Sequence, residues 1–326
     1  MAINSKGRIE ITDLDFDTVK DNFKSFLSQQ TQFTDYNFEG SGMSVLMDLL
    51  AYNTHYLAFH ANMLANEMFI DTALTRASAV SHAKALGYLP SSAKASTAIV
   101  DITVTGVPTS QTSLVMAAGT IFTTSVNDTS YQFVTIGDHT ATSATGTFVF
   151  SEISIYEGTR VRYQYTVDSS NLEQQFVIPS ATVDTSTIIV SVQTSSSDVT
   201  TEVYTLNTDY AELKSTSLTY FIQEVEGSQY EVYFGDGVTG KKPIDGNIVI
   251  LDYVVTNGTL ADGAGAFTAA STIGGYSDIA VTSSGGSSSG GGDAETVDSI
   301  KFNAPLKYAT QGRAVTPDDY KSIVPS

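Results

Sequence analysis

The sequence of 326 residues contains neither cysteine nor tryptophan, and each absence excludes or disfavours a class of protein. A disulfide scaffold, a zinc finger with cysteine ligands and a thiol nucleophile all require cysteine. Glycan-binding surfaces usually stack sugar rings on exposed aromatic side chains, so the lack of tryptophan counts mildly against that function. The chain must fold without covalent cross-links.

Basic residues are also scarce, with 16 Lys and Arg against 35 Asp and Glu, a formal net charge of −19 and a pI of about 4.3. Nucleic-acid binding depends on clustered Lys and Arg that replace counterions along the phosphate backbone. The longest basic run is the pair Lys241-Lys242. We therefore expect no nucleic-acid partner. Dispersed carboxylates would instead keep the chain soluble before any assembly.

Long apolar runs are missing as well. The most apolar stretch, residues 43–70, is interrupted by Asp, Asn, His and Glu side chains, and the N-terminus lacks the apolar segment of a secretory signal. The sequence predicts a soluble protein made in the cytoplasm, with no membrane partner.

The apolar residues between positions 13 and 90 recur with the period of an α-helix. We predict three helices: a short one capped by Asp15 or Asp17, a long one that begins after residues 40–42, and a third from Asp71 as N-cap to Gly87 just past its end. They predict an N-terminal helical domain over residues 1–95, a hairpin or small bundle.

The long helix is apolar over more than the ~100° stripe that a surface helix needs. Its apolar surface predicts a helical partner interface, and a core within the chain would use the same pattern equally well. The candidate interface residues are Val45, Leu46, Leu49, Leu50, Tyr52, Tyr56, Phe59 and Met63.

From residue 96 to residue 282 the apolar period changes to two, and the runs are rich in β-branched and aromatic residues. This pattern predicts one or more antiparallel β domains of the sandwich or barrel type. The Gly/Ser segment 283–292 predicts a flexible linker or an ordinary surface loop. The fold class is therefore α+β.

Residues 293–326 are expected to begin a C-terminal helical domain. Asp293 would cap a short helix that runs through Phe302 and ends before Pro305, and Thr316-Pro317 carries start signals for another helix. Because that helix has almost no room before Ser326, we expect the chain to be the N-terminal part of a longer protein.

The residues offer little catalytic chemistry. The four histidines do not share ligand spacings, and no G-x-S-x-G motif is present. The carboxylates Glu224, Glu226, Glu231 and Asp236 could be read as a glycosidase pair or a calcium site, but alternating carboxylates more often line the wet face of a strand. We predict no catalytic residue, cofactor or metal.

Residues 235–240 spell G-x-G-x-x-G, the glycine spacing of a dinucleotide fingerprint. That fingerprint requires a helix directly after the glycines, because the helix N-terminus holds the pyrophosphate. Here a loop with Pro243 and Gly246 follows, and then the strand-like run NIVILDYVV. The pattern predicts a β-hairpin in place of a nucleotide site.

The same segment, YEVYFGDGVTGKKPIDGNIVILDYVVTNG, resembles the glycine-rich pattern of the baseplate J-like family of contractile-tailed bacteriophages and related injection machines. AAGTIFTT, around Gly119 and Thr120, resembles a third, weaker element of that family. The residues that carry the first pattern are Phe234, Gly235, Asp236, Gly237, Gly240, Pro243 and Gly246. TQGRAVTPDDYKSIV resembles the family's R-x-V-T-x-x-D-Y signature through Arg313, Val315, Thr316, Asp319 and Tyr320.

The helical start, from FTDYNFEGSGMSVLMDLL to ALGYLP, is similar to the N-terminal region of the large inner-ring baseplate wedge proteins of the myovirus type. The resemblance implies a structural protein of the virion, without catalytic activity, made in the host cytoplasm. In that family two copies join another wedge protein through helical bundles, neighbouring wedges close into a ring around the hub and tail tube, and the sheath starts there. The alternatives from the residues alone are a tail adhesin that binds glycans and a tail glycosidase.

Overall fold

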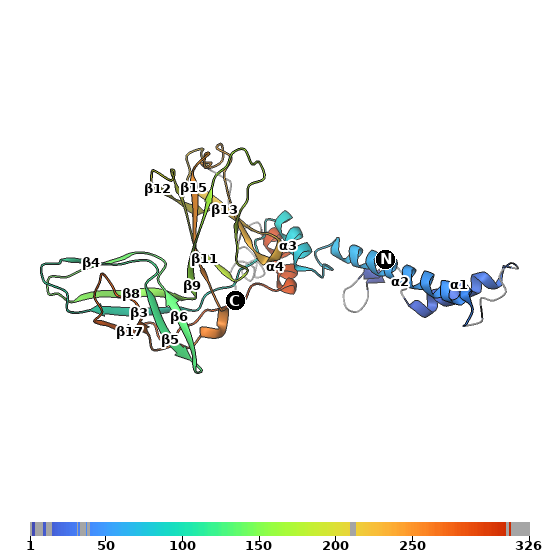
Figure 1. Ribbon diagram of the computed structural model, residues 1–326, viewed down its shortest axis with the longest axis horizontal. Helices are drawn as coiled ribbons and strands as arrows, with labels where there is room; N and C mark the ends of the chain where they lie inside the picture. Colours follow the sequence, from blue (N-terminus) through green and yellow to red (C-terminus); the bar gives the residue numbers. More distant parts are fainter. Residues whose placement is uncertain are drawn as a thin grey trace. The chain divides into compact units, whose positions relative to one another are not determined.

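The structure is a computed structural model that describes residues 2–3, 9–10, 15–30, 32, 37, 40–208, 213–310 and 313 (Figure 1). It confirms the α+β class: helices come first, antiparallel sheets follow, and a further helix comes last. The chain divides into two compact units, Met1–Tyr88 with Thr296–Ser326, and Leu89–Glu295. Among the described residues, no helix is both long and apolar enough to cross a membrane.

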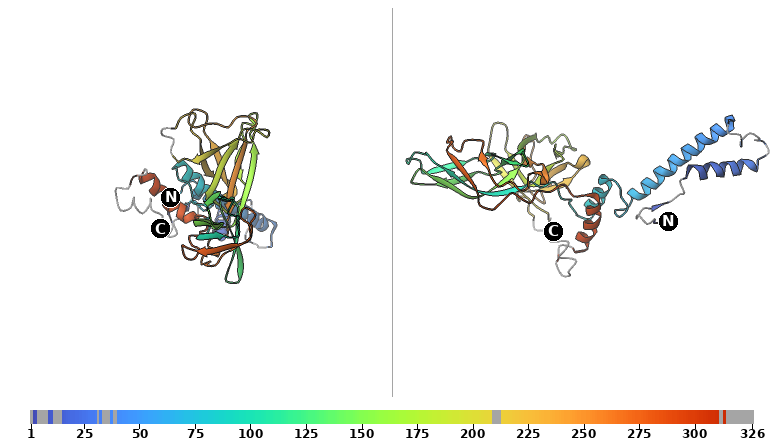
Figure 2. Two further views of the ribbon diagram at one scale, coloured as in Figure 1. Left: turned by 90° about the vertical axis from the view of Figure 1, so that its left-hand side faces the viewer. Right: turned by 90° about the horizontal axis from the view of Figure 1, so that it is seen from below.

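The helical unit begins with the two-residue strands β1 (Ala2–Ile3) and β2 (Ile9–Glu10), which pair antiparallel. Helix α1 (Phe16–Ser28) is capped by Asp15, whose carboxylate accepts from the Thr18 backbone N–H at 3.3 Å. Helix α2 (Gly42–Glu67) is capped by the hydroxyl of Ser41. The two helices pack against each other, as the views in Figure 2 show, and an ion pair of 2.6 Å joins Lys20 to Asp48.

Helix α3 (Arg76–Ala85) starts later than the sequence predicts, because Thr75 and not Asp71 is its N-cap. The Glu67 carboxylate at the end of α2 accepts from the backbone N–H groups of Leu74 and Thr75, which fixes the turn before α3. The expected end is confirmed, since Gly87 follows the last turn with φ = 70°.

Helix α4 (Val297–Thr310) corrects two sequence-based expectations. Asp293 precedes the helix without capping it, and Thr296 accepts from the Ser299 N–H instead. The helix also continues through Pro305, where one backbone hydrogen bond is lost. Packing against α3 compensates, because Ile300 and Ala304 are buried with the small residues of α3. The C-terminal helix therefore belongs to the same unit as the N-terminal helices.

The β unit contains two cores. The first lies between a six-stranded sheet of order β16-β5-β6-β8-β3-β17 and the pair β4-β7. Its strands are β3 (Thr97–Val104), β4 (Ser113–Met116), β5 (Ile121–Val126), β6 (Thr129–Val134), β7 (His139–Thr142), β8 (Phe148–Glu157), β16 (Thr268–Ala269) and β17 (Ile279–Ser283).

The second core is enclosed by a seven-stranded sheet of order β10-β14-β13-β12-β11-β15-β9, in which only β12 and β13 run parallel. Its strands are β9 (Thr159–Thr166), β10 (Phe176–Ile178), β11 (Val183–Gln193), β12 (Thr201–Leu206), β13 (Thr219–Glu224), β14 (Tyr230–Phe234) and β15 (Ile248–Val255). The sheet curls so far that the Tyr165 hydroxyl on one edge strand donates to the Val177 carbonyl on the other at 2.6 Å.

The prediction that the segment around residues 235–240 forms a β-hairpin is wrong. β14 and β15 lie in one sheet, but β13, β12 and β11 separate them. The loop between them is longer than a tight turn, and strand β14 finds its partners in β13 and β10. The part of the prediction that excluded a helix after the glycines is confirmed.

The Gly/Ser segment 283–292 is not the flexible linker that its composition predicts. Its backbone donates to Ile99, Thr97 and Lys94, and the side chain of Ser288 is buried. Glycine is needed here for close approach, since a Cβ on Gly291 would lie 2.4 Å from a neighbouring backbone oxygen. The segment is thus an ordered part of the β unit, and the unit boundary falls after it, at residue 295.

Candidate functional site

The surface of α2 separates into two sides. Buried positions recur at helical spacing and include Met47, Ala51, Asn62 and Ala65, so one side of the helix faces its own unit. All eight residues predicted as a partner interface lie outside this buried set and are exposed. The structure thus places the predicted residues on one exposed surface, here called the α2 apolar surface, which Leu57 and Leu64 extend.

The exposure of this surface is large for apolar side chains. Leu49 is 62% exposed and Tyr56 is 46% exposed. Tyr52 and Tyr56 pack edge to face with ring centroids 4.7 Å apart. With Phe59 they line a shallow recess of about 310 Å³. Each side chain of this size would gain roughly 1.5–3 kcal/mol if it were fully buried.

The α2 apolar surface carries almost no charge. Asp48 and Glu67 are the only acidic residues of the helix, and both are engaged, one by Lys20 and the other by the turn before α3. The polar residues at the middle of the exposed side are Asn53 and His60. Such a surface can bind apolar side chains of another helix.

The glycine motif forms a loop that is stabilised by its own aspartate. The Asp236 carboxylate accepts from the backbone N–H groups of Thr239 and Val238 at 2.8 and 2.9 Å, and from the Thr239 hydroxyl. These hydrogen bonds lower the pKa of Asp236 below its ordinary value, and the one from the Thr239 backbone N–H has the largest effect. A Cβ on Gly235 would lie 2.0 Å from the Thr239 carbonyl oxygen, so only glycine fits there.

The other motif residues have similarly local roles. The Phe234 ring packs edge to face against Phe176 and Tyr204, and it belongs to the periphery of the second core. Gly237, Gly240 and Gly246 all have positive φ, and Pro243 lies in the same loop. Arg313 lies just past α4, while Val315, Thr316, Asp319 and Tyr320 lie outside the described residues.

The carboxylates Glu224 and Glu231 do not lie on the same face of the sheet. In the β13–β14 register, Glu224 stands opposite Tyr230, and Gln223 stands opposite Glu231. Cross-strand neighbours share a face and successive residues alternate, so Glu224 and Glu231 point to opposite faces of the sheet. Within the described part of the chain, no cluster of three His, Asp or Glu side chains could hold a metal.

Exposed aromatic side chains are also rare where a glycan site would need them. Among the described residues of the β unit, Tyr163 is the only aromatic side chain that is largely exposed. The others that are exposed lie in the helical unit, most of them on α2 or just after it. The exposed aromatic side chains of the described residues therefore do not favour the adhesin alternative.

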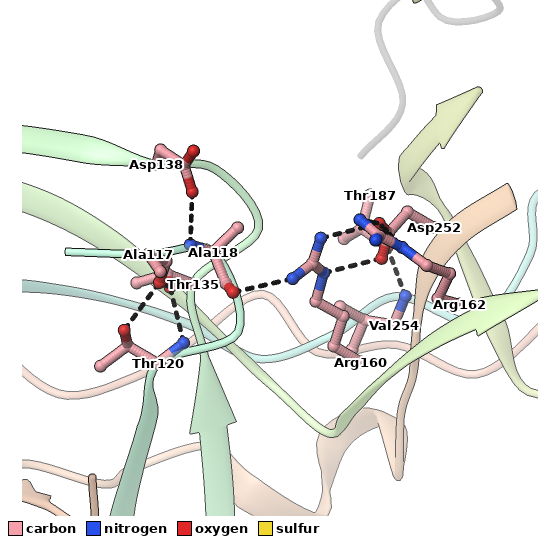
Figure 3. A network of polar contacts seen from close by, with 10 residues as sticks. All are labelled: Ala117, Ala118, Thr120, Thr135, Asp138, Arg160, Arg162, Thr187, Asp252 and Val254. Carbon is pink, nitrogen blue, oxygen red and sulfur yellow. Dashed lines mark hydrogen bonds and ion pairs between the residues drawn. The ribbon is translucent and has the colours of Figure 1, made fainter. Parts of the chain in front are cut away.

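The β unit also contains a polar network that none of the sequence motifs predicts (Figure 3). Asp252 on β15 is buried and binds two arginines of β9: Arg160 Nε lies 2.7 Å from Oδ1, and Arg162 Nη2 lies 2.7 Å from Oδ2. Arg160 also donates to the Ala118 carbonyl at 2.8 Å, beside Gly119. The signal was present in the sequence as two arginines two residues apart, among only five in the chain.

Comparison with known proteins finds a family that the helical unit resembles. Residues 15–88, which contain the whole α2 apolar surface, match the family described as "Baseplate wedge protein gp6-like, helical domain". The N-terminal helices are therefore similar to the helical domain of gp6-like baseplate wedge proteins. The chain is also 29% identical, over 95% of its length, to the baseplate wedge protein gp6 of Enterobacteria phage T4. It covers 49% of that relative, about half of its length.

The match confirms that the chain is related to the baseplate wedge proteins of myovirus-type phages. It also gives the α2 apolar surface a context, because the gp6-like helical domain includes α1, α2 and α3.

Proposed function

We propose that the chain is a non-enzymatic structural component of a phage tail baseplate wedge, and that its α2 apolar surface enters a helical bundle formed by several chains. Its position would be in the virion, in the inner baseplate ring around the hub and tail tube. There it would contact a second copy of itself, other wedge proteins and the neighbouring wedges, and support the start of the sheath.

The observation that carries the proposal is the exposure of α2. A monomeric soluble protein rarely leaves a contiguous apolar patch of this kind open to water. α2 does so on a helix that is capped and packed on its other side, and Leu46, Leu49 and Tyr56 point away from its own core. An amphipathic helix that lays such a face against another helix is a common mode of protein recognition.

Two structural features support a role without catalysis. The motif loop around Asp236 is held by hydrogen bonds within the loop itself, so its glycine-rich pattern is explained by folding. The carboxylates Glu224 and Glu231 face opposite sides of the sheet, so these two do not form the carboxylate pair of a glycosidase.

The proposal is tested by placing charges on the exposed surface. Leu49→Glu together with Tyr56→Glu should abolish co-purification with co-expressed wedge chains, because burying two carboxylates in an apolar bundle is costly. Both side chains are exposed in the free chain, so its melting temperature should change little.

A matched control adds two charges at exposed apolar positions of the β unit. Leu172 and Val199 are both exposed there. Leu172→Glu together with Val199→Glu should leave co-purification unchanged. Normal wedge assembly by the Leu49→Glu/Tyr56→Glu variant would refute the proposed role of α2.

A further inference from the structure

Strand β9 is an open edge of the seven-stranded sheet. It pairs with β15 over its whole length, from Thr159 opposite Val255 to Thr166 opposite Ile248. No other strand of the described chain pairs with it as a ladder, and the sheet order ends there. Arg162, Tyr163 and Gln164 are exposed, as expected of an edge that is open in its middle.

The hydrogen bonds show which groups of β9 face outward. The Val167 N–H donates to the Asn247 carbonyl, so odd-numbered residues direct their backbone groups toward β15 and even-numbered ones direct theirs away from it. At the two ends of β9, the backbone groups that face away from β15 already have hydrogen-bond partners. The Gly158 N–H donates to the Gln132 carbonyl at 2.8 Å, and the Thr166 carbonyl accepts from the Gln174 amide at 2.7 Å.

Between these two ends the outward backbone groups of Arg160, Arg162 and Gln164 have no hydrogen bond anywhere in the described part of the chain. They form a short row of donors and acceptors with the spacing of a β-ladder. The opposite edge strand, β10, approaches only through the Tyr165 side chain and not through the backbone. An additional strand could therefore pair with β9 at this row.

The charges along β9 indicate what such a strand would carry. Arg160 and Arg162 share the single carboxylate of Asp252, which leaves an excess of one positive charge in a chain of net charge −19. The Arg162 side chain is 58% exposed. Beside the two guanidinium groups lies a cavity of about 330 Å³, also lined by Gly119 and Gln132.

The two faces of β9 differ in chemistry. Residues that stand opposite each other on paired strands share a face, so a residue added opposite Arg162 would lie next to its guanidinium group. The other face presents Tyr163 and Val161, which would favour an apolar neighbour. An incoming segment that alternates acidic and apolar residues would match both faces.

We propose that the β9 edge is a docking site for an extended acidic segment of a partner protein, which adds one strand to the sheet and places a carboxylate beside Arg162. The backbone row between Arg160 and Gln164 supplies the ladder hydrogen bonds. The shared Asp252 leaves the arginines able to accept one more negative charge. This site is separate from the α2 apolar surface, so an experiment can contradict one of the two proposals without contradicting the other.

The probe is a blocked peptide of about seven residues, Thr-Val-Asp-Val-Asp-Val-Thr, added at millimolar concentration to the full ¹⁵N-labelled chain. We expect saturable amide shifts along β9 and slower hydrogen exchange at Arg162 and Gln164. The same peptide with Lys in place of Asp should bind more weakly. Arg162→Gln should weaken binding of the acidic peptide about two- to fivefold and remove the preference between peptides.

A second pair of variants tests whether the backbone of β9 forms hydrogen bonds with the peptide. Gln164→Pro removes an outward N–H without removing a bond to β15, and proline is tolerated on the open side of an edge strand. It should lower the affinity for the acidic peptide tenfold or more, whereas Gln164→Thr, which keeps the N–H, should not. Unchanged circular dichroism of both variants confirms that the sheet is intact.

Three results would overturn the inference. The first is an absence of saturable shifts with the acidic peptide. The second is equal binding of the Asp and Lys peptides, or shifts that map away from β9. The third is concentration-dependent pairing of the chain with itself through β9 in the absence of peptide, since a second copy would then be the occupant.

Discussion

Replacement of Asp252 by alanine tests whether the polar network of Figure 3 holds β9 to the rest of the β unit. The carboxylate is buried, and it is the shared partner of Arg160 and Arg162. Its removal leaves two guanidinium groups without their counter-charge. The variant should therefore fold, but with a lower free energy of unfolding.

The expected magnitude follows from the exposure of the two arginines. Breaking a fully buried ion pair costs about 3–5 kcal/mol. Arg160 is largely buried and keeps its bond to the Ala118 carbonyl, so part of that cost is avoided. Arg162 is exposed enough to regain water and should contribute less than about 1 kcal/mol. We therefore expect Asp252→Ala to lower the free energy of unfolding by about 2–4 kcal/mol.

Urea unfolding followed by tyrosine fluorescence and circular dichroism measures this free energy. In a domain of about 200 residues, the predicted loss corresponds to a fall in melting temperature of roughly 4–16 °C. A double-mutant cycle between Asp252→Ala and Arg160→Met should give a coupling of at least about 1 kcal/mol, and Arg162→Met should couple less. Additive effects in both cycles would refute the reasoning.

Two further predictions concern other parts of the chain. Ile300→Ala should destabilise the helical unit by about 2–5 kcal/mol because it opens a cavity between α3 and α4. Phe302→Ala, at a 69% exposed position of the same helix, should cost less than about 0.5 kcal/mol. Equal melting temperatures of the two variants would contradict the packing of α3 against α4. The hydrogen bonds from Thr239 lower the pKa of Asp236, so its charge stabilises the loop above its ordinary pKa of 3.8, and this stabilisation is lost as the pH falls through the lowered folded pKa. NMR titration of the Asp236 carboxyl checks this, and a midpoint at or above 3.8 would contradict it.

The sequence predicts the helical elements well because their signals are local. Asp15 and Ser41 precede apolar runs of helical period, and each caps its helix. Asp71 carries the same signal without capping a helix, because the Glu67 carboxylate fixes a turn there and shifts the start of α3 to Thr75. Pro305 predicts a helix end, but burial against α3 outweighs the loss of one hydrogen bond.

The β unit shows where local signals are insufficient. Period-two patterns locate β14 and β15, but the sequence of neither strand indicates that three other strands lie between them in the sheet. The Gly/Ser composition of residues 283–292 predicts a flexible tether, but the pairing partners lie near residues 94–99, far away in the sequence. Partners that are distant along the chain are set by the packing of the whole unit.

The candidate site was predictable in part. The width of the apolar stripe on α2 identifies the residues, but only the structure shows that they are exposed and not part of an internal core. The two closely spaced arginines are a sequence signal for the Arg160–Asp252 network, but their partner could not be predicted because Asp252 lies about ninety residues away.

The absence of cysteine allows a direct test of the central claim, that the α2 apolar surface is buried when the wedge assembles. Leu57→Cys and Val199→Cys each introduce one thiol at an exposed position, the first on α2 and the second in the β unit. Maleimide labelling rates are compared between the free chain and the purified baseplate. Both thiols should react readily in the free chain, and only the one at position 57 should become protected in the baseplate. Equal labelling of position 57 in the two states would contradict the account.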